Sequence, residues 1–441
     1  MQALRRLHNE KGAYNMNEKS NSKNYGLMVI VAAFLVYFVF FGYRSAFSVL
    51  LTPMTTDMGW DTASVTAGYS IMMLVYAVIS YFSGLIFSKF GPKFCFGIAT
   101  VTGFLGYFVT SYANSYLMYL LPYSIFAGTA TGMLFVPAVS TIRSWFIGNA
   151  YGKAFGFAAA GACIAQVILT LGLKAVLLTM DWRVAMKLLG AVALVLLLIA
   201  TLITKQAPQT YGMEPKGEMI GGKKSVSETA SYTWSVKEAF TTYFVWGSIL
   251  SFFCSCFSEF LIWSQLVRYW QTDVGLSMGT STNLYAFVGL LGCVFEPLLG
   301  TFSDKYASKV GDETKARKIL MFFAAASGVL GMICLLAGKT SIVITIIACI
   351  FFAAYWQGLP GQVTGYMGSV FGRSFPKIWG LATLIIMGIG PAVGSYLGAK
   401  LYDVFGSYKV SFIVATIMFV LSAVFAFTLP KDAKLPAKLK K

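Results

Sequence analysis

The chain has 441 residues, of which 57% are hydrophobic and only 12% are charged, whereas an average soluble domain is about a quarter charged. This composition excludes a soluble enzyme, a disordered chain and a secreted disulfide-bonded scaffold. The net charge of +17 would indicate nucleic acid in a soluble protein, but in a membrane protein Lys and Arg collect in cytoplasmic loops, so we expect no nucleic-acid partner. The apolar runs are continuous rather than alternating, which disfavours an outer-membrane β-barrel. We therefore predict an all-α membrane protein embedded in the lipid bilayer.

The hydrophobic residues form twelve runs long enough to span a membrane, since a spanning helix needs about 20 residues. The first six are followed by a polar break at 204–240 and then by six more. The predicted spans are 27–54, 64–88, 94–112, 116–142, 150–178, 184–203, 241–268, 280–302, 319–338, 341–366, 379–401 and 409–429. We predict five segments: an N-terminal tail (1–26), a six-helix half (27–203), a linker (204–240), a second six-helix half (241–429) and a basic tail (430–441).

The basic residues predict the orientation of the chain. If the N-terminus lies in the cytoplasm, the segments on that side carry most of the 34 Lys and Arg, whereas the loop at 55–63 on the other side carries Asp57 and Asp61 and no base. The positive-inside rule therefore places both termini and the linker in the cytoplasm of a multi-pass cell-membrane protein.

The sequence offers no constellation for metal binding, a cofactor or covalent catalysis. Its only histidine, His8, lies in the polar tail, and its seven cysteines all lie in apolar stretches, where cysteine behaves as a small hydrophobic residue. We predict no metal, no cofactor and no enzymatic activity.

Corresponding loops of the two halves carry related motifs. Gly84, Ser88, Gly91 and Lys93 match the pattern G-x-x-x-(D/S)-x-x-G-x-(K/R) after the second run. Gly300 and Asp304 begin a second copy after the eighth run, which then continues into a basic loop from Lys305 to Lys318. With these motifs and twelve spans, the chain resembles the major facilitator superfamily. The resemblance implies two pseudo-symmetric six-helix halves, with the motif residues acting in gating.

Within that superfamily, the sequence is similar to the oxalate:formate antiporter and monocarboxylate porter branch. The similarity rests on short segments in a shared order, which are Gly42–Phe47, Leu51–Pro53, Arg143–Phe146, Trp182–Arg183, Pro208–Pro215, Phe371–Arg373 and Tyr402–Tyr408. Arg143, Arg183 and Arg373 are interpreted as interdomain gate and topology residues. Two features depart from the branch: Glu296-Pro297 stands where monocarboxylate porters commonly have Arg-Pro, and the stretch from Gly156 to Gly172 lacks the usual Gly-Pro.

Three ionisable residues, Arg44, Glu259 and Glu296, lie within predicted spans. Such groups cost at least about 2.5 kcal/mol each in a bilayer and are functional candidates by default. The planar guanidinium of Arg44 suits a substrate carboxylate. Burial favours the uncharged form of a carboxyl group, so Glu296, and with less weight Glu259, is a candidate for the substrate's cationic part or a coupling proton. The alternatives are a structural ion pair between Arg44 and either glutamate, or an arginine that extends to the membrane surface.

In this superfamily the first, fourth, seventh, eighth and tenth helices line the central cavity. Carried over residue by residue, this implies further substrate-binding candidates, whose aromatic faces would also suit an amine through cation–π attraction. These candidates are Tyr43, Tyr123, Trp263, Tyr285, Tyr355, Trp356 and Gln357.

The residues and the resemblance together predict a secondary active transporter that acts as a monomer. It would move a small mono- or dicarboxylate by alternating access, through proton symport or anion exchange. The alternatives are a transporter of an organic cation or zwitterion, favoured by Glu296 and Glu259, and a solute sensor on the same scaffold.

Overall fold

The computed structural model describes residues 2–60, 62–218, 228–263, 266–337, 341–432 and 434. The described chain is almost entirely helical, and its only β-type pairing is an isolated bridge between Phe146 and Lys216. Eleven described stretches are long and apolar enough to span a membrane. One of them, Ile342–Gly394, has 53 residues and contains two crossings that the short 3₁₀ turn Gly372–Ser374 separates. The predicted twelve-helix architecture is therefore confirmed.

The first half is built from six crossings, of which the fourth is interrupted. A π-helical turn, η1 (Pro122–Ala127), begins at a proline, which has no N–H to donate to a preceding carbonyl. The helices are α1 (Gln2–Met58), α2 (Thr62–Phe90), α3 (Pro92–Thr110), α4 (Tyr116–Leu121), α5 (Gly128–Gly132), α6 (Phe135–Trp145), α7 (Tyr151–Leu177) and α8 (Trp182–Ile203).

The second half repeats this plan after a linker with three short helical pieces. The linker contains η3 (Pro208–Tyr211), α9 (Glu228–Ser231) and α10 (Val236–Ala239). The helices of the second half are α11 (Tyr243–Trp263), α12 (Leu266–Thr272), α13 (Met278–Val310), α14 (Glu313–Ala337), α15 (Ile342–Phe371), α16 (Phe375–Thr383), the π-helical turn η7 (Leu384–Ile389), α17 (Gly390–Phe405) and α18 (Lys409–Thr428).

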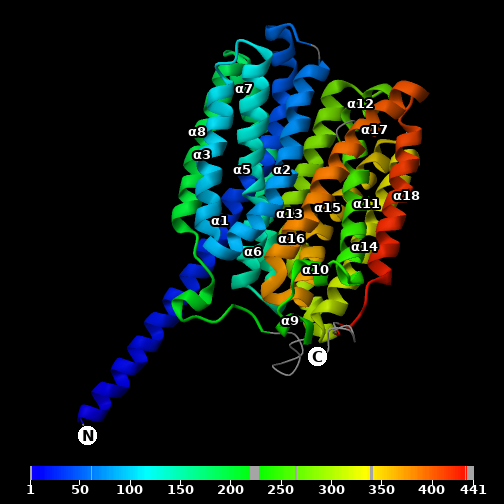
Figure 1. The fold of residues 1–441 in the computed structure, drawn as a ribbon. Helices are drawn as coiled ribbons and strands as arrows, with labels where there is room; N and C mark the ends of the chain where they lie inside the picture. Colours follow the sequence, from blue (N-terminus) through cyan, green and yellow to red (C-terminus); the bar gives the residue numbers. More distant parts are fainter. Residues whose placement is uncertain are drawn as a thin grey trace.

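The two halves lie side by side, with the chain from blue to green in one and from green to red in the other (Figure 1). The start of α1 and the short helices α9 and α10 lie at the same end of the bundle (Figure 1). We call this end the linker end and the other the opposite end. The halves meet closely along α7 and α13, where a Cβ added to Gly300 would lie 2.1 Å from the carbonyl oxygen of Gly152.

The predicted basic loop between Lys305 and Lys318 is wrong. Helix α13 continues to Val310 and α14 begins at Glu313, so only Gly311 and Asp312 separate them. Gly311 ends α13 in a left-handed conformation, with φ of 75°, which glycine adopts without steric cost. Asp312 then accepts a hydrogen bond at 2.9 Å from the amide of Lys315, as N-cap residues do. The basic side chains thus project from two helix ends.

Candidate functional site

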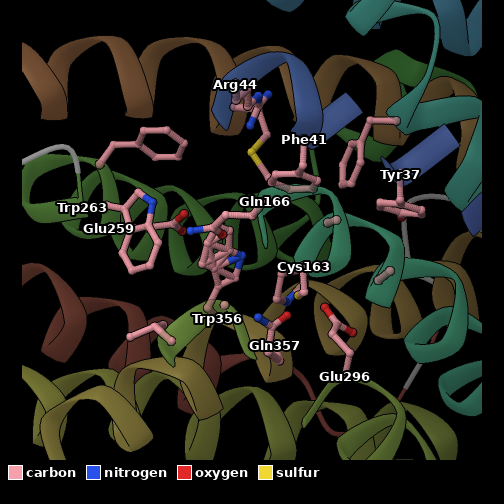
Figure 2. Close-up of a pocket in the computed structure, with 18 of the residues that line it drawn as sticks. Tyr37, Phe41, Arg44, Cys163, Gln166, Glu259, Trp263, Glu296, Trp356 and Gln357 are labelled. Atoms are coloured by element: carbon pink, nitrogen blue, oxygen red, sulfur yellow. The ribbon is translucent and has the colours of Figure 1, made fainter. Parts of the chain in front are cut away.

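A small cavity of about 50 Å³ lies between the two halves (Figure 2). A buried water needs about 10–15 Å³ of such free space, so the cavity holds a few waters or part of a compact solute. Its walls come mainly from α1, α7, α11, α13 and α15. The lining residues are Tyr37, Phe41, Arg44, Phe135, Phe155, Ala159, Ala162, Cys163, Gln166, Phe252, Glu259, Phe260, Trp263, Val288, Gly289, Glu296, Trp356, Gln357, Pro360 and Met387.

Arg44 is the cation of this cavity. Its guanidinium carbon lies 4.4 Å from the ring centre of Phe40, 5.4 Å from that of Phe41 and 5.1 Å from that of Tyr76. Aromatic faces attract a cation but accept no conventional hydrogen bond, and the buried Nε and Nη2 atoms have no hydrogen-bond partner. Among the ion pairs of the described residues, none includes Arg44. The arrangement leaves donors available for an anion.

Glu259 lies on α11 and is 6% exposed. Its Oε2 atom accepts a hydrogen bond at 3.3 Å from the hydroxyl of Tyr355 on α15. Next to it, the indole of Trp263 stacks on Phe352 with ring centres 5.3 Å apart and lies 5.3 Å from that of Trp356. This corner therefore combines a carboxyl group with an aromatic wall.

Glu296 lies on α13 and is also 6% exposed. Figure 2 shows its carboxyl group on the side of the cavity away from Arg44, near Gln357 and Cys163. The amide of Gln357 occupies the space that Gly292 leaves free, since a Cβ at Gly292 would be 2.4 Å from the Gln357 Nε2 atom. The structure does not pair Glu296 or Glu259 with Arg44, so the ion-pair alternatives are not realised here.

The structure brings six of the ten predicted substrate-binding residues to the cavity wall: Arg44, Glu259, Trp263, Glu296, Trp356 and Gln357. The other four, all tyrosines, do not line it. Tyr43 packs on Tyr107 with ring centres 4.4 Å apart, Tyr123 stacks on Tyr119 at 5.6 Å, and Tyr285 lies against Trp263 at 4.3 Å. Tyr355 contributes through its hydrogen bond to Glu259.

Several lining residues are absent from the sequence predictions. On α1, Tyr37 and Phe41 precede Arg44 by seven and three residues and therefore share its helix face. The Nε2 atom of Gln166 on α7 is buried without a hydrogen-bond partner. The hydroxyl of Tyr37 is likewise buried and has no partner. Helical spacing around Arg44 could have identified the two α1 residues.

At the linker end, charged groups connect the halves. Arg143 at the end of α6 forms two hydrogen bonds with Glu313 of α14, at 2.8 and 3.3 Å. Asp304 of α13 accepts hydrogen bonds from the amides of Gly152 and Lys153, at 2.8 and 2.7 Å, where the positive end of the α7 dipole favours an anion. We call these contacts, with those of Arg317, the linker-end latch.

Arg317, which lay in the predicted loop, completes the latch. It is fully buried, pairs with Asp304 at 2.9 Å and with Glu313 at 3.6 Å, and donates a hydrogen bond at 3.2 Å to the Gly148 carbonyl of the other half. Glu313 and Arg317 were not predicted as gate residues. The sequence pattern that could have identified them is an acid and a base four residues apart, close after the Asp304 motif, because such residues lie on the same face of a helix.

The remaining predicted gate residues have simpler surroundings. Ser88 donates a hydrogen bond at 2.8 Å to the Gly84 carbonyl within its own helix. Gly84 permits close packing against the second half, since a Cβ there would be 2.4 Å from the carbonyl oxygen of Pro376. Gly91 adopts φ of 78° at the start of α3. Lys93 and Arg373 are exposed.

At the opposite end, the ion pair Arg183–Asp57, at 2.5 Å, lies within the first half. Trp182 also donates a hydrogen bond at 2.8 Å to Asp57 Oδ2. The hydrogen bond from Trp182, and then that from Arg183, lowers the pKa of Asp57 from its usual value. Within the described parts of the chain, one ion pair joins the two halves, Arg143–Glu313, and it lies at the linker end.

Comparison with known proteins agrees with this architecture. The family model of the Major Facilitator Superfamily matches residues 33–377. The chain is 24% identical to the "Probable sulfoacetate transporter SauU" of Cupriavidus necator, covering 88% of this chain and 90% of that protein. It is also 24% identical to the oxalate:formate antiporter of Oxalobacter formigenes, covering 97% and 98% of the two chains.

A solved structure shares the fold. The proton:xylose symporter XylE superposes with a TM-score of 0.70 at 16% sequence identity, covering 94% of this chain and 98% of that one. At this level of identity the likeness concerns the fold alone.

Proposed function

Because the chain belongs to the Major Facilitator Superfamily, we propose that this membrane transporter moves a small carboxylate-bearing metabolite by alternating access and that Arg44 binds the carboxylate. The observation that carries the proposal is the Arg44 guanidinium, which faces the central cavity with two buried nitrogen atoms, Nε and Nη2, that have no hydrogen-bond partner. A buried unpaired charge is costly, and a carboxylate would satisfy it with charge-assisted hydrogen bonds.

Three relatives support an acidic substrate. They are the sulfoacetate transporter and the oxalate:formate antiporter described above, and the "Probable galactarate/D-glucarate transporter GudP" of Bacillus subtilis, 22% identical over 85% of this chain. The substrates in these names are organic acids. In this conformation, the small volume of the cavity favours the smaller of these acids, such as formate and oxalate, over galactarate and D-glucarate.

Uptake into proteoliposomes tests the role of Arg44. We would measure uptake of labelled oxalate, formate, sulfoacetate and D-glucarate by the wild type, and expect at least one to be transported. Arg44→Lys keeps the charge but loses the bidentate fork. The loss of a charge-assisted hydrogen bond costs about 1.5–3 kcal/mol, so we expect KM to rise roughly ten- to hundredfold.

The control for this experiment is Lys400→Gln, which removes an exposed positive charge from α17 and should leave KM unchanged. Carboxylate uptake by Arg44→Lys with wild-type KM would contradict the binding role of Arg44.

We also propose that the linker end faces the cytoplasm, on the charge distribution. The halves 27–203 and 241–429 would then move about the central cavity, with 204–240 connecting them. Alternate exposure of a site between two halves is how such folds transport a solute. A protease site inserted at the C-terminus tests the orientation. Added protease should cleave this site in inverted membrane vesicles and should not cleave it in intact cells.

Glu296 is our candidate for the coupling proton, because its carboxyl group faces the cavity without a basic partner among the described ion pairs. We expect Glu296→Gln to keep exchange of labelled for unlabelled substrate but to lose accumulation driven by a pH gradient. Gradient-driven accumulation by Glu296→Gln at the wild-type level would exclude this role.

A second candidate function is transport of an organic cation or zwitterion. It is favoured by Glu259, which lies beside the aromatic wall of Trp263 and Trp356, a combination that attracts ammonium groups. This candidate would be favoured if choline or an amino acid is taken up, and if Glu259→Gln abolishes that uptake while Arg44→Lys preserves it.

The solute-sensor alternative has its own test. Accumulation of any solute against its gradient would exclude it.

A further inference from the structure

Two cysteines from different halves meet beside the central cavity. Cys163 lies on α7 and lines the cavity, and Cys293 lies on α13. Their thiols lie near enough to influence each other's ionisation. The helices approach closely here, since a Cβ added to Gly292 would be 2.6 Å from the Cys163 Sγ atom. The contact thus depends on the present arrangement of the halves.

Both cysteines are free thiols, and the Cys163 thiol also lies beside the side-chain amide of Gln357. Cys163 is 6% exposed, and Cys293 is half-buried and donates a weak hydrogen bond at 3.6 Å to the carbonyl of Gly289, one turn earlier in α13. The other described cysteines lie elsewhere: Cys95, for example, contacts the Ser83 carbonyl at 3.9 Å inside the first half. Among the described residues, Cys163 and Cys293 therefore form a thiol pair that crosses the interface between the halves.

We propose that Cys163 and Cys293 form a redox-modifiable dithiol site, which a small two-electron oxidant converts into a disulfide that joins the halves in this conformation. Two S–H bonds break and one S–S bond forms. Hydrogen peroxide accepts the two electrons and two protons and leaves as two waters. The cavity, which Cys163 lines, gives a small neutral oxidant its route to the thiols.

The disulfide would stop alternating access. Opening the linker end requires α7 and α13 to separate, because they are in backbone contact at Gly152 and Gly300. A covalent bond between the same two helices holds them together, so the oxidised protein would be trapped with its linker-end latch closed.

The test treats the purified full-length protein with diamide, which is reduced to the hydrazine as the disulfide forms. After denaturation, free thiols are counted by maleimide mass labelling, and peptides are mapped by mass spectrometry. We expect the number of free thiols to fall by two from the initial seven, one cross-linked peptide to contain Cys163 and Cys293, and the melting temperature to rise. Dithiothreitol should reverse all three changes.

After diamide treatment, Cys163→Ala and Cys293→Ala should each retain all six remaining free thiols and show no rise in melting temperature. Cys95→Ala should lose two free thiols and melt at a higher temperature, like the wild type. If Cys163→Ala fails to fold, Cys163→Ser and Cys293→Ala give the same comparison. Full retention of thiols by the wild type, or a cross-link that involves other cysteines, would overturn the proposal. Failure of the carboxylate proposal would leave these results unchanged.

Discussion

At the scale of single residues, the cavity depends on where helical rotation directs each side chain. Arg44 faces the cavity, whereas its neighbour Tyr43 packs on Tyr107 inside the first half. Adjacent residues of an α-helix, with 3.6 residues per turn, point about 100° apart, and this rotation directs Tyr43 toward α3 of its own half. The residues that do share the face of Arg44 are Tyr37 and Phe41. One stripe of α1 therefore forms the cationic wall of the cavity.

Asp57 provides a pH-dependent prediction at this scale. Hydrogen bonds from Trp182 and Arg183 lower its pKa, so the stabilisation is present above the unfolded-state pKa and is lost as the pH falls through the lower folded-state value. Asp57→Asn removes this contribution. We expect Asp57→Asn to melt below the wild type at neutral pH, with the difference shrinking in acid, as measured by thermal unfolding from pH 7 to pH 3.

The matched control for Asp57 is Asp432→Asn, since Asp432 is an exposed acid outside the bundle. It should leave the melting curve unchanged at every pH. A constant difference between Asp57→Asn and the wild type across the acid range would contradict the assigned role of the Asp57 charge.

At the scale of secondary-structure elements, glycines determine how closely α7 and α13 approach. Gly152 contacts the Gly300 backbone, and one turn further Gly156 contacts the carbonyl of Glu296. Gly152 and Gly156 are four residues apart, as are Glu296 and Gly300, so each pair lies on one face of its helix. Small residues at such spacing let helices pack at backbone distance in membranes. This seam connects the cavity with the linker-end latch.

Gly156→Ala tests the seam. The added Cβ would lie 2.2 Å from the Glu296 carbonyl oxygen, so the helices must separate, and overpacking of this kind costs about 1–3 kcal/mol. We expect a lower melting temperature and slower uptake. Gly172→Ala, on the same helix with no atom within 4 Å of its added Cβ, should be neutral or stabilising by about 0.5–1 kcal/mol. Equal melting temperatures for the two variants would refute the role of the seam.

The sequence predicts the helices well because bilayer thickness sets their length. The predicted spans 150–178 and 409–429 agree with α7 and α18 to within one residue at each end. The boundary between α13 and α14 was misjudged because Arg317 and Lys318 indicate a loop by charge, whereas tertiary ion pairs make Arg317 a buried helical residue. A hydropathy profile cannot predict that an ion pair with a residue outside the averaged window, here Asp304, buries a charged side chain.

The candidate site is only partly predictable for the same reason. A charged group in an apolar run is conspicuous, so Arg44, Glu259 and Glu296 can be selected from the sequence alone. Tyrosines are common in this chain, and whether one faces the cavity depends on packing between halves. Gln166 and Cys163 carried no such signal because α7 has a polar or small residue at many positions.

At the scale of the whole molecule, the distribution of ion pairs indicates which end is closed. Arg143–Glu313 joins the halves at the linker end, where Asp304 of the second half also binds two amides of α7, whereas Arg183–Asp57 at the opposite end stays within one half. Among the described residues, the halves are thus latched by charge at one end only. In the proposed alternating access, a solute or proton can redistribute the two conformations only through a difference in its affinity for them. The latch would then contribute to the free energy that binding must offset.

The latch can be tested by a double-mutant cycle on Arg143 and Glu313. Their side chains are 11% and 14% exposed. Glu313→Gln leaves the nearly buried charge of Arg143 without its ion-pair partner, whereas Arg143→Gln leaves Glu313 with only Arg317, at 3.6 Å. We expect both to weaken the closed linker end, and the double variant to lose less than the sum, with a coupling energy of about 0.5–3 kcal/mol. Thermal unfolding gives the energies.

Spin labels report the accompanying motion. With the native cysteines replaced, labels at Lys93 and Lys377, exposed positions in different halves near the linker end, should move apart in Arg143→Gln and Glu313→Gln. Arg373→Gln removes an exposed charge from the same end and should leave the distance unchanged. Additive energies in the cycle, together with an unaltered label distance, would show that Arg143 and Glu313 do not hold the halves together. The closed end would then depend on the glycine seam and on Asp304, whose bonds to the α7 amides join the same two halves.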